Sequence, residues 1–262
     1  MLADITVMIL TYNEEPNIRR TLEKLAWARD IVVVDSGSTD ATLEIVKGFP
    51  QARVVTRRFD SFARQCNYGL EQVRTEWVLS LDADYVLTDE VVAELGGLDF
   101  SAGTAGYMTR FVYCVHGHRL RASLYPPRTV LYRRELASYR DDGHGHKVSL
   151  EGSTKMLAGA ILHDDRKPLE RWFGEQIKYA GAEAVKLVAA SPADLNRADR
   201  IRRMMWSAPF LVLVYTLLVQ RLILDGWPGW FYAFQRMLAE VVLSLRLLEA
   251  RITRMELQPP DP

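Results

Sequence analysis

Residues 77–84 decide the fold, and they read Trp-Val-Leu-Ser-Leu-Asp-Ala-Asp. The apolar run Trp77–Leu81 is typical of a strand buried on both faces of a sheet. Asp82 and Asp84 follow directly, and alternate side chains of an extended chain point to one side. Two carboxylates so close repel each other unless a cation neutralises them, and oxygen ligands favour Mg²⁺ or Mn²⁺. The stretch therefore predicts a buried strand that ends in a metal site, with Asp82 and Asp84 as ligands.

The residues before this strand alternate between strand and helix patterns. Short apolar runs rich in β-branched residues predict strands at Ile5–Leu10, Ile31–Val34 and Arg53–Thr56. A helix is expected after the first run, with Asn13 as its cap, and another over residues 62–73. This alternation predicts an α/β fold, with a mostly parallel sheet and helices on both of its faces.

Polar side chains occupy the carboxyl ends of three of these strands: Thr11–Glu14, Asp35–Ser38 and Asp82–Asp84. In open α/β sheets, ligands bind beyond the carboxyl ends of the strands. One polar turn at such a position is common, but three at one sheet edge predict a nucleotide or metal site.

The second half of the chain has a different sequence pattern. Strand-like runs at Tyr107–Val115, Thr129–Tyr132 and Met156–Leu162 predict either a second sheet or an extension of the first. A long helix is expected over residues 169–190. We therefore divide the chain into an α/β domain at residues 1–190 and a C-terminal helical region at residues 191–262.

The helical region combines basic and apolar residues. Four arginines between residues 197 and 203 precede an apolar run over residues 209–219. This run is shorter than the ~20 residues that a membrane-spanning helix needs. Arginine and tryptophan at its edges are typical of an amphipathic hairpin at a membrane interface, which predicts a membrane-associating region. A buried helical pair, or the interface of a homo-oligomer, is the alternative.

The charges balance over the whole chain but not locally. The 262 residues contain 33 Lys and Arg against 33 Asp and Glu, so no nucleic-acid partner is expected from bulk electrostatics. Two cysteines are too few for a disulfide framework, which favours a reducing compartment, and the N-terminus is not of the secretory type. Residues 82–99 contain six acids and no base, whereas residues 107–140 contain seven arginines and one glutamate.

Four motifs in this order resemble the family 2 glycosyltransferases, which have the GT-A nucleotide-sugar-binding fold: Thr11–Glu14, Val33–Asp40, Phe62–Leu70 and Leu81–Asp84. The resemblance implies that the nucleotide pocket is lined by Thr11, Tyr12, Asn13 and Glu14, and that Asp35 contacts the base or ribose. It places Arg64 near the diphosphate, and Asp82 and Asp84 near the ribose and the metal. Carboxylate and guanidinium groups suit these ligands.

The middle of the chain is similar to one branch of that family, the lipopolysaccharide-core and surface-polysaccharide transferases. The similarity is carried by Tyr125–Arg128, Leu131–Arg134 and Ile161–His163. Many members of the branch have a His-Glu pair whose Glu is a candidate catalytic base. In this sequence Gly145 and His146 take those two positions, which leaves the identity of the base open.

Several acids and one histidine can serve as the general base that inverting transfer requires. We prefer Asp142 and His146, because a glycine-rich loop can approach the donor closely. Asp141, Asp164 and Asp165 are the other candidates. His163 ends an apolar strand, so it is either a third metal ligand or a hydrogen-bonded structural residue.

These observations predict a metal-dependent inverting glycosyltransferase. It would move a sugar from a nucleotide-diphosphate donor, with UDP favoured, to a glycan or glycolipid in lipopolysaccharide or surface-polysaccharide synthesis. Arg119, Arg121 and Arg128 are expected to face an anionic acceptor, or else to balance the acidic stretch. The expected location is the cytoplasmic face of a bacterial inner membrane. A polyprenyl-phosphate sugar synthase, a nucleotidyltransferase and an inactive sugar-nucleotide-binding subunit are the alternatives.

Overall fold

The computed structural model describes residues 2–100, 103–142 and 145–257. The chain forms two compact units. Unit 1 comprises Met1–Arg119 and Leu124–Lys167, and unit 2 comprises Leu120–Ser123 and Pro168–Pro262. The division after Lys167 lies one helix earlier in the chain than the predicted boundary at residue 190.

Unit 1 is built on four parallel strands in the order β3-β2-β1-β4. Their bounds are Ile5–Thr11 for β1, Ile31–Asp35 for β2, Ala52–Thr56 for β3 and Trp77–Asp82 for β4. The crossover helices are α1 (Ile18–Glu23), α2 (Thr42–Lys47) and α3 (Phe62–Gln72). The predicted α/β alternation is confirmed: β1, β2 and β4 are apolar strands buried within the sheet, and β3 is a partly exposed edge strand.

The second half of unit 1 extends the same sheet, in the order β4-β8-β6-β11-β5. The bounds of the long strands are Arg128–Arg133 for β8, Gly106–Val115 for β6 and Thr154–His163 for β11. Short strands β5 (Tyr85–Val86) and β7 (His118–Arg119) pair with β11 and β6, and α4 spans Asp89–Gly97. Strand β8 is antiparallel to β4 and to β6, and β11 is parallel to β6, so β11 runs in the direction of β4.

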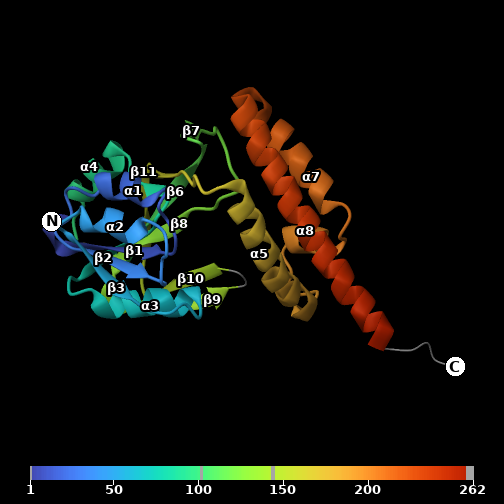
Figure 1. Ribbon diagram of the computed structural model, residues 1–262, viewed down its shortest axis with the longest axis horizontal. Coiled ribbons are helices and arrows are strands. Elements are labelled where there is room, and N and C mark those ends of the chain that lie inside the picture. The colour runs from blue at the N-terminus through green and yellow to red at the C-terminus, as the bar shows by residue number, and fades with distance from the viewer. Residues whose placement is uncertain (1, 101–102, 143–144, 258–262) are drawn as a thin grey trace. The chain divides into compact units, whose positions relative to one another are not determined.

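A separate hairpin stands where the sequence suggested a glycine-rich loop. Its strands β9 (Ala137–Asp142) and β10 (Gly145–Leu150) pair with each other in antiparallel register. The expectation of an irregular loop over residues 141–146 was therefore wrong for the backbone of the two strand ends. Figure 1 shows the hairpin beside α3, below the sheet as drawn.

Two layers of apolar side chains cover the sheet. One contains residues of β1 and β4 with α1 and α4, among them Ile9, Leu22, Leu79 and Val91. The other joins β1 and β2 to α3 and the hairpin. On that side a Cβ at Gly69 would overlap the Met8 side chain, so only glycine lets α3 approach β1 this closely.

Unit 2 is helical. It contains α5 (Leu169–Ala189), α6 (Arg197–Arg203), α7 (Ala208–Val214), a π-helical turn at Tyr215–Val219, a 3₁₀ turn at Leu222–Asp225 and the long α8 (Trp227–Leu257). Ala184 and Leu187 of α5 pack with Leu243 and Leu247 of α8. Within the described residues, no helix is both long and apolar enough to cross a membrane.

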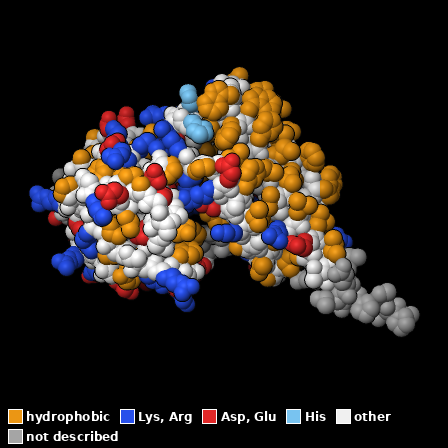
Figure 2. Space-filling model, in the orientation of Figure 1, with side chains coloured by type: hydrophobic (Ala, Val, Ile, Leu, Met, Phe, Trp, Pro, Cys, Tyr) orange, Lys and Arg blue, Asp and Glu red, His pale blue; other side chains and the backbone are white. Residues whose placement is uncertain are grey.

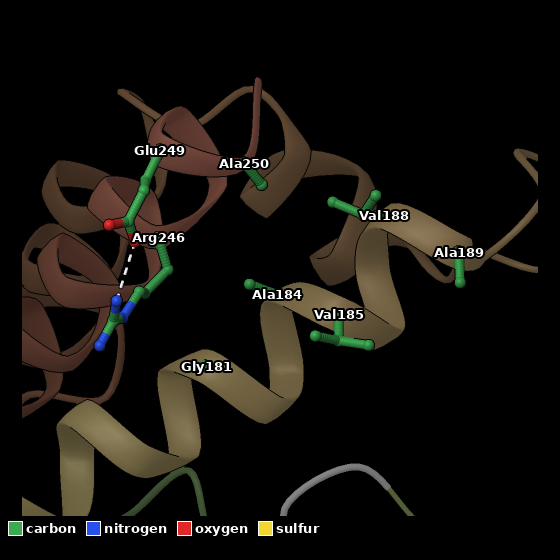
Figure 3. Close-up of a pocket in the computed structure, with 8 residues that line it drawn as sticks. All are labelled: Gly181, Ala184, Val185, Val188, Ala189, Arg246, Glu249 and Ala250. Carbon is green, nitrogen blue, oxygen red and sulfur yellow. Dashed lines mark hydrogen bonds and ion pairs between the residues drawn. The ribbon is translucent and has the colours of Figure 1, made fainter. Parts of the chain in front are cut away.

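A groove of about 460 Å³ runs between α5 and α8. Figure 3 shows Gly181, Ala184 and Val185 on the α5 side, and the ion pair of Arg246 with Glu249 on the α8 side. None of the predicted site residues lines this groove.

Large apolar side chains of unit 2 are exposed just before α7, over α7, in the turns after it and at the start of α8. We call this set the apolar surface, and it comprises Trp206, Phe210, Leu211, Val214, Leu218, Val219, Leu224 and Trp227. The exposed fraction reaches 72% at Trp206, 63% at Phe210 and 65% at Val219. Figure 2 shows hydrophobic side chains gathered over these helices. Exposed apolar patches of this kind are typical of surfaces that bind a partner or a membrane.

Candidate active site

The carboxyl ends of β1, β2 and β4 meet at one edge of the sheet. Thr11 is in register with Asp35 on one side of β1, and Leu10 is in register with Asp82 on the other. The Thr11 hydroxyl donates a hydrogen bond to Asp35 Oδ1 over 3.1 Å. The structure therefore brings together three of the predicted polar groups at the edge where α/β sheets bind ligands.

Asp35 builds the turn that follows β2. Its Oδ2 accepts hydrogen bonds from the backbone N–H groups of Gly37 and Ser38, at 2.8 and 2.9 Å, and its side chain is fully buried. Gly37 has a φ of +92°, a conformation that glycine adopts without strain. Asp35 thus shapes the loop at the sheet edge. Its contact with the base or ribose stays a prediction.

Asn13 joins the loops after β1 and β2. Its backbone is left-handed, with φ +54°, its N–H donates to Ser38 Oγ over 2.8 Å, and its side-chain oxygen accepts from the Thr39 N–H over 2.7 Å. The expectation that it caps the next helix was wrong, because α1 begins at Ile18 and Asn17 holds the cap position. Asn13 instead fixes the spacing between the two loops.

Tyr12 and Arg64 are the exposed members of the predicted donor site. Tyr12 is half-exposed, and the Arg64 side chain is mostly exposed and lies 3.3 Å from Asp60. Both leave a ring or a guanidinium accessible to a ligand. Their assignments to nucleotide and diphosphate stay predictions.

Asp84 and His163 form the central pair of the site. His163 Nε2 lies 3.3 Å from Asp84 Oδ2, and both side chains are almost completely buried. Burial favours the neutral forms, but the opposite charges outweigh it, so the pKa of Asp84 is lowered and that of His163 is raised. The parallel direction of β4 and β11 explains the meeting, because it puts the ends of both strands at one sheet edge.

Two buried polar atoms of this pair are left unsatisfied. Asp84 Oδ1 and His163 Nδ1 have no hydrogen-bond partner among the residues that the structure describes. A buried carboxylate oxygen without a partner is costly, and a cation would satisfy it. No group of three or more His, Cys, Asp or Glu side chains in the described part of the chain is arranged to hold a metal. The residues present therefore fit a metal held through one or two carboxylates and completed by substrate oxygens.

Lys167 is the functional residue that sequence reasoning missed. Its ammonium lies 3.0 Å from Glu14 Oε1, 3.3 Å from Asp165 Oδ2 and 4.0 Å from Asp84 Oδ2. Burial would lower its pKa, but these three carboxylates raise it, so Lys167 stays charged. A signal was present: two acids and then two bases, at residues 164–167, follow a strand that ends at the site edge.

Glu14 is the predicted donor-site residue that Lys167 holds in place. Its Oε2 accepts a hydrogen bond from Asn17 Nδ2 over 2.9 Å, and its own N–H donates to Thr42 Oγ1 over 2.7 Å. Burial raises the pKa of Glu14 to about 7, against the opposing effect of Lys167 and with a further increase from Asp84. Glu14 therefore titrates near neutral pH.

Two of the lesser base candidates are already engaged. Asp164 accepts from the Gly117 N–H over 3.0 Å and pairs with Arg166 over 2.7 Å. Asp165 accepts from Asn17 Nδ2 over 2.9 Å and contacts Lys167. These carboxylates build the network around the site, which leaves them poorly placed to take a proton from an acceptor.

The preferred bases belong to the ends of the β9–β10 hairpin. The backbones of Asp142 and His146 lie in β9 and β10, but their side chains lie outside the described residues. Asn67 of α3 holds the hairpin by donating to the Tyr139 carbonyl and accepting from the Tyr139 N–H, at 3.0 and 2.9 Å. Asp141 accepts from the Ala63 N–H at the start of α3 over 3.1 Å. The hairpin is thus tied to α3 at two points along the helix.

The three arginines expected at the acceptor are placed differently from one another. Arg119 is exposed, and the Arg128 guanidinium lies over the Tyr125 ring at 4.7 Å. Arg121 pairs with Asp225 within unit 2 at 2.7 Å. Tyr125 reaches the site: its hydroxyl hydrogen-bonds the Tyr85 hydroxyl, and its ring centroid lies 4.7 Å from that of His163.

The chain is similar to known glycosyltransferases. Residues 6–140 match the family model described as Glycosyl transferase family 2. The lipopolysaccharide core biosynthesis glycosyltransferase LpsC of Rhizobium meliloti (strain 1021) is 34% identical, and the alignment covers 94% of this chain and 94% of that protein. An uncharacterized glycosyltransferase of Rickettsia bellii (strain RML369-C) is 24% identical over 89% of this chain and 84% of its own length.

A solved structure shares the fold. The mannosyltransferase PcManGT of Pyrobaculum calidifontis, in complex with GDP-Man and Mn²⁺, aligns with a TM-score of 0.56 at 14% identity, over 95% of this chain and 88% of that chain. At this identity the likeness concerns the fold alone. With the match to the family model and the relationship to LpsC, it leads to one conclusion: this chain is an enzyme of glycosyltransferase family 2 with the GT-A fold.

Proposed function

We propose that the enzyme is a metal-dependent inverting transferase that uses a nucleotide-diphosphate sugar, with UDP favoured, and adds the sugar to a lipopolysaccharide-core or surface glycan. The observation that carries the proposal is the buried Asp84–His163 pair, whose free oxygen and nitrogen lie at the carboxyl edge of the sheet. The relationship to LpsC, whose name assigns it to lipopolysaccharide core biosynthesis, supports the acceptor class.

The donor would bind across the loops that follow β1 and β2. Thr11, Tyr12 and Asn13 line that edge, and the exposed Tyr12 ring offers a stacking surface for a base. Glu14 and Asp35 supply acceptors for ribose hydroxyls or a uracil N–H, and Arg64 supplies a guanidinium for the diphosphate. The mannosyltransferase of the same fold was solved with a nucleotide sugar and Mn²⁺, which supports this class of donor.

Asp84 would hold the metal, Mg²⁺ or Mn²⁺, with Asp82 and His163 beside it. When bound, the metal neutralises the charge that develops on the departing diphosphate. His163 fixes the orientation of the Asp84 carboxylate, and Lys167 keeps its charge balanced until the donor arrives. Asp82, at the end of β4, adds a second carboxylate at the same edge.

Asp142, or His146 in its place, would take the proton from the acceptor hydroxyl as the sugar is transferred. The sequence supports this choice, because both residues border Gly143 and Gly145, where an acceptor can approach closely. The anchoring of the hairpin by Asn67 and Asp141 supports it as well, since a general base needs a fixed distance to its substrate.

The proposed place of work is the cytoplasmic face of the inner membrane, with unit 2 lying on the lipid surface. The apolar surface supports this, because it combines exposed Trp206 and Trp227 with the arginines of α6. Tryptophan and arginine together are favoured at the boundary between hydrocarbon and anionic head groups.

A donor screen with two variants tests the proposal. UDP-, GDP- and ADP-sugars are compared by thermal stabilisation with Mn²⁺ and with EDTA, since a bound ligand raises the melting temperature. We expect one donor to stabilise the wild type only with the metal. Asp84→Asn should weaken metal-dependent donor binding at least about 100-fold, because it removes the charge that the cation needs. Asp89→Asn is the matched control, because Asp89 is an exposed acid of the same acidic stretch, paired with Lys24.

Two results would contradict the proposal. Donor stabilisation that is equal with metal and with EDTA would remove the metal from the mechanism. A donor affinity that Asp84→Asn leaves unchanged would remove Asp84 from the site.

A further inference from the structure

Arg128 is a partly buried arginine at the carboxyl edge of the sheet of unit 1. It is the first residue of β8, and Asp82 is the last residue of β4, with which β8 pairs in antiparallel register. Antiparallel pairing puts the start of one strand beside the end of the other. Burial would lower the pKa of Arg128, but Tyr125, Tyr85 and Asp82 raise it. These three side chains therefore surround the guanidinium at the edge where the metal site is proposed.

The Tyr125 ring supports the guanidinium from one side. The Arg128 Cζ atom lies 4.7 Å from the ring centroid, which is the distance of a cation–π contact. Tyr125 is itself held, because its hydroxyl hydrogen-bonds the Tyr85 hydroxyl and its ring packs edge-on against Phe111, with centroids 5.1 Å apart. An arginine stacked on a fixed ring loses little conformational freedom when it binds a ligand.

The protein leaves the donor groups of this guanidinium unused. Apart from its contact with Tyr125, the Arg128 side chain forms no hydrogen bond or ion pair with any residue that the structure describes. Other arginines of the site differ, since Arg20 and Arg166 pair with Asp164 at 3.6 and 2.7 Å. A guanidinium presents five N–H donors in a rigid fork that fits the oxygens of a phosphate or carboxylate. Arg128 thus has the features of an anion-binding arginine.

We infer that Arg128 is a substrate-binding residue, whose guanidinium receives a phosphate or carboxylate group of a substrate at the carboxyl edge of the sheet. The inference deepens the proposed function and rests on it for the identity of the substrates. Two sources offer such a group: the diphosphate of the donor and an acidic group on the acceptor glycan. Arg121 is not equivalent, because its guanidinium is already paired with Asp225.

Inorganic pyrophosphate tests the anion site without a known donor or acceptor. Its half-saturating concentration is measured by thermal stabilisation in the presence of Mg²⁺, and the melting temperature without ligand shows that each variant is folded. Arg128→Gln should raise this concentration about 10- to 100-fold, because charge-assisted hydrogen bonds are lost. Arg128→Lys keeps the charge without the fork and should give an intermediate value. Arg110→Gln is the matched control, because Arg110 is an exposed arginine of the same sheet.

Two further comparisons identify the source of the anion. If it is the donor diphosphate, Arg128→Gln should weaken the binding of UDP with Mn²⁺ about 10- to 100-fold and leave that of uridine within about twofold. If it belongs to the acceptor, Arg128→Gln should raise the KM of a lipopolysaccharide-core acceptor by the same factor. It should then have no effect on the same acceptor after its phosphates are removed or its carboxylates amidated. Such non-additivity between a residue and a ligand group indicates direct contact, and a loss of structure would not produce it.

Variants of Tyr125 test the support of the guanidinium. Tyr125→Leu removes the ring and should cause about a three- to tenfold loss in the same comparison that Arg128→Gln affects. Combined with Arg128→Gln it should cause no further loss, because both substitutions break one interaction. Tyr125→Phe keeps the ring and should retain most of the binding.

The outcomes distinguish the inference from the proposed function. An affinity for pyrophosphate that Arg128→Gln leaves at the wild-type value would overturn the inference. Unchanged binding in both the UDP and the acceptor comparisons would overturn it as well. A wild type that neither binds UDP with Mn²⁺ nor transfers a sugar would contradict the proposed function, while the pyrophosphate measurement still decides the role of Arg128.

Discussion

Among the basic side chains described at the site, Lys167 lies near the largest number of carboxylates. Its ammonium faces Glu14, Asp165 and Asp84 within 4.0 Å and is almost completely buried. Removing one member of a buried charge network leaves the others uncompensated and costs several kcal/mol, on the order of 3–5. The acids of the donor edge can therefore stand close together only because Lys167 is there.

Glu14 makes the stability of the enzyme depend on pH near neutrality. Its pKa is raised from an ordinary 4.5 to about 7, so between these values the folded state keeps a proton that the unfolded state has lost. The contribution of Glu14 to stability is therefore largest at low pH and falls as pH rises through this window, on the order of 1–3 kcal/mol. Glu14→Gln should abolish this fall.

Melting temperatures between pH 5 and 7.5 in EDTA check the expectation. The wild-type value should drop relative to Glu14→Gln as pH rises, whereas Glu44→Gln, an exposed control, should follow the wild type. Parallel curves for the wild type and Glu14→Gln would show that Glu14 does not titrate in this window.

The sequence predicted some site residues better than others. The sequence points to Asp82 and Asp84 because they follow an apolar strand directly, and to His163 because it ends one, and their role as metal ligands stays a prediction. Asn17 and Lys167 were not found, since their roles arise only where segments distant in the chain meet. A polar residue at the end of a strand can be predicted from the residues next to it in the sequence. A buried network of ion pairs forms only when β4, β8, β6 and β11 pair in the sheet.

At the level of elements, the sequence predicted the strands that are buried on both faces of the sheet. Strands β1, β2 and β4 are continuous apolar runs, a pattern that is typical of strands buried on both faces of a parallel sheet. The β9–β10 hairpin escaped prediction, because the apolar–polar alternation of Ala137–Arg140 is only four residues long and two acids follow it. Its contacts with the rest of unit 1 include the packing of Tyr139, Val148 and Leu150 in the apolar layer beside α3 and the two hydrogen bonds of Asn67.

The turn that opens α8 depends on a glycine. A Cβ at Gly229 would overlap the Leu222 carbonyl oxygen, whereas a Cβ at Gly181 in α5 meets nothing within 4 Å. Gly229→Ala should destabilise unit 2 by at least about 1–3 kcal/mol through overpacking against rigid backbone. Gly181→Ala should be neutral or stabilising by up to about 1 kcal/mol, because alanine favours a helix.

Chemical denaturation followed by far-UV circular dichroism compares the two variants. The helical signal should be lost at lower denaturant in Gly229→Ala than in Gly181→Ala. Equal midpoints would show that the turn can rearrange to accept a side chain.

At the scale of the molecule, the apolar surface separates two interpretations of unit 2. If it binds lipid, Phe210→Ser/Val219→Ser should weaken binding to vesicles of phosphatidylethanolamine and phosphatidylglycerol by about 10- to 100-fold, because two large exposed apolar groups are lost. Val54→Ser/Phe59→Ser is the matched control, since it replaces an exposed valine and phenylalanine of unit 1.

Vesicle flotation measures lipid binding, and light scattering measures the mass of the oligomer. Together they separate the two interpretations. Wild-type flotation that the first pair of substitutions reduces, with a monomeric mass throughout, supports the membrane role. A wild-type dimer that the same substitutions dissociate, without flotation, would make the apolar surface a homo-oligomer interface instead.

The path of the chain between its two units limits which pieces of the gene relatives can exchange. The chain passes from one unit to the other after Arg119, after Ser123 and after Lys167. Residues 168–262 are therefore no detachable appendage: a truncation at Lys167 would expose Leu120 and leave Arg121 without Asp225. An exchange of C-terminal regions between relatives must carry the four residues at 120–123 with it, so recombination has to treat two distant pieces of the gene as one module.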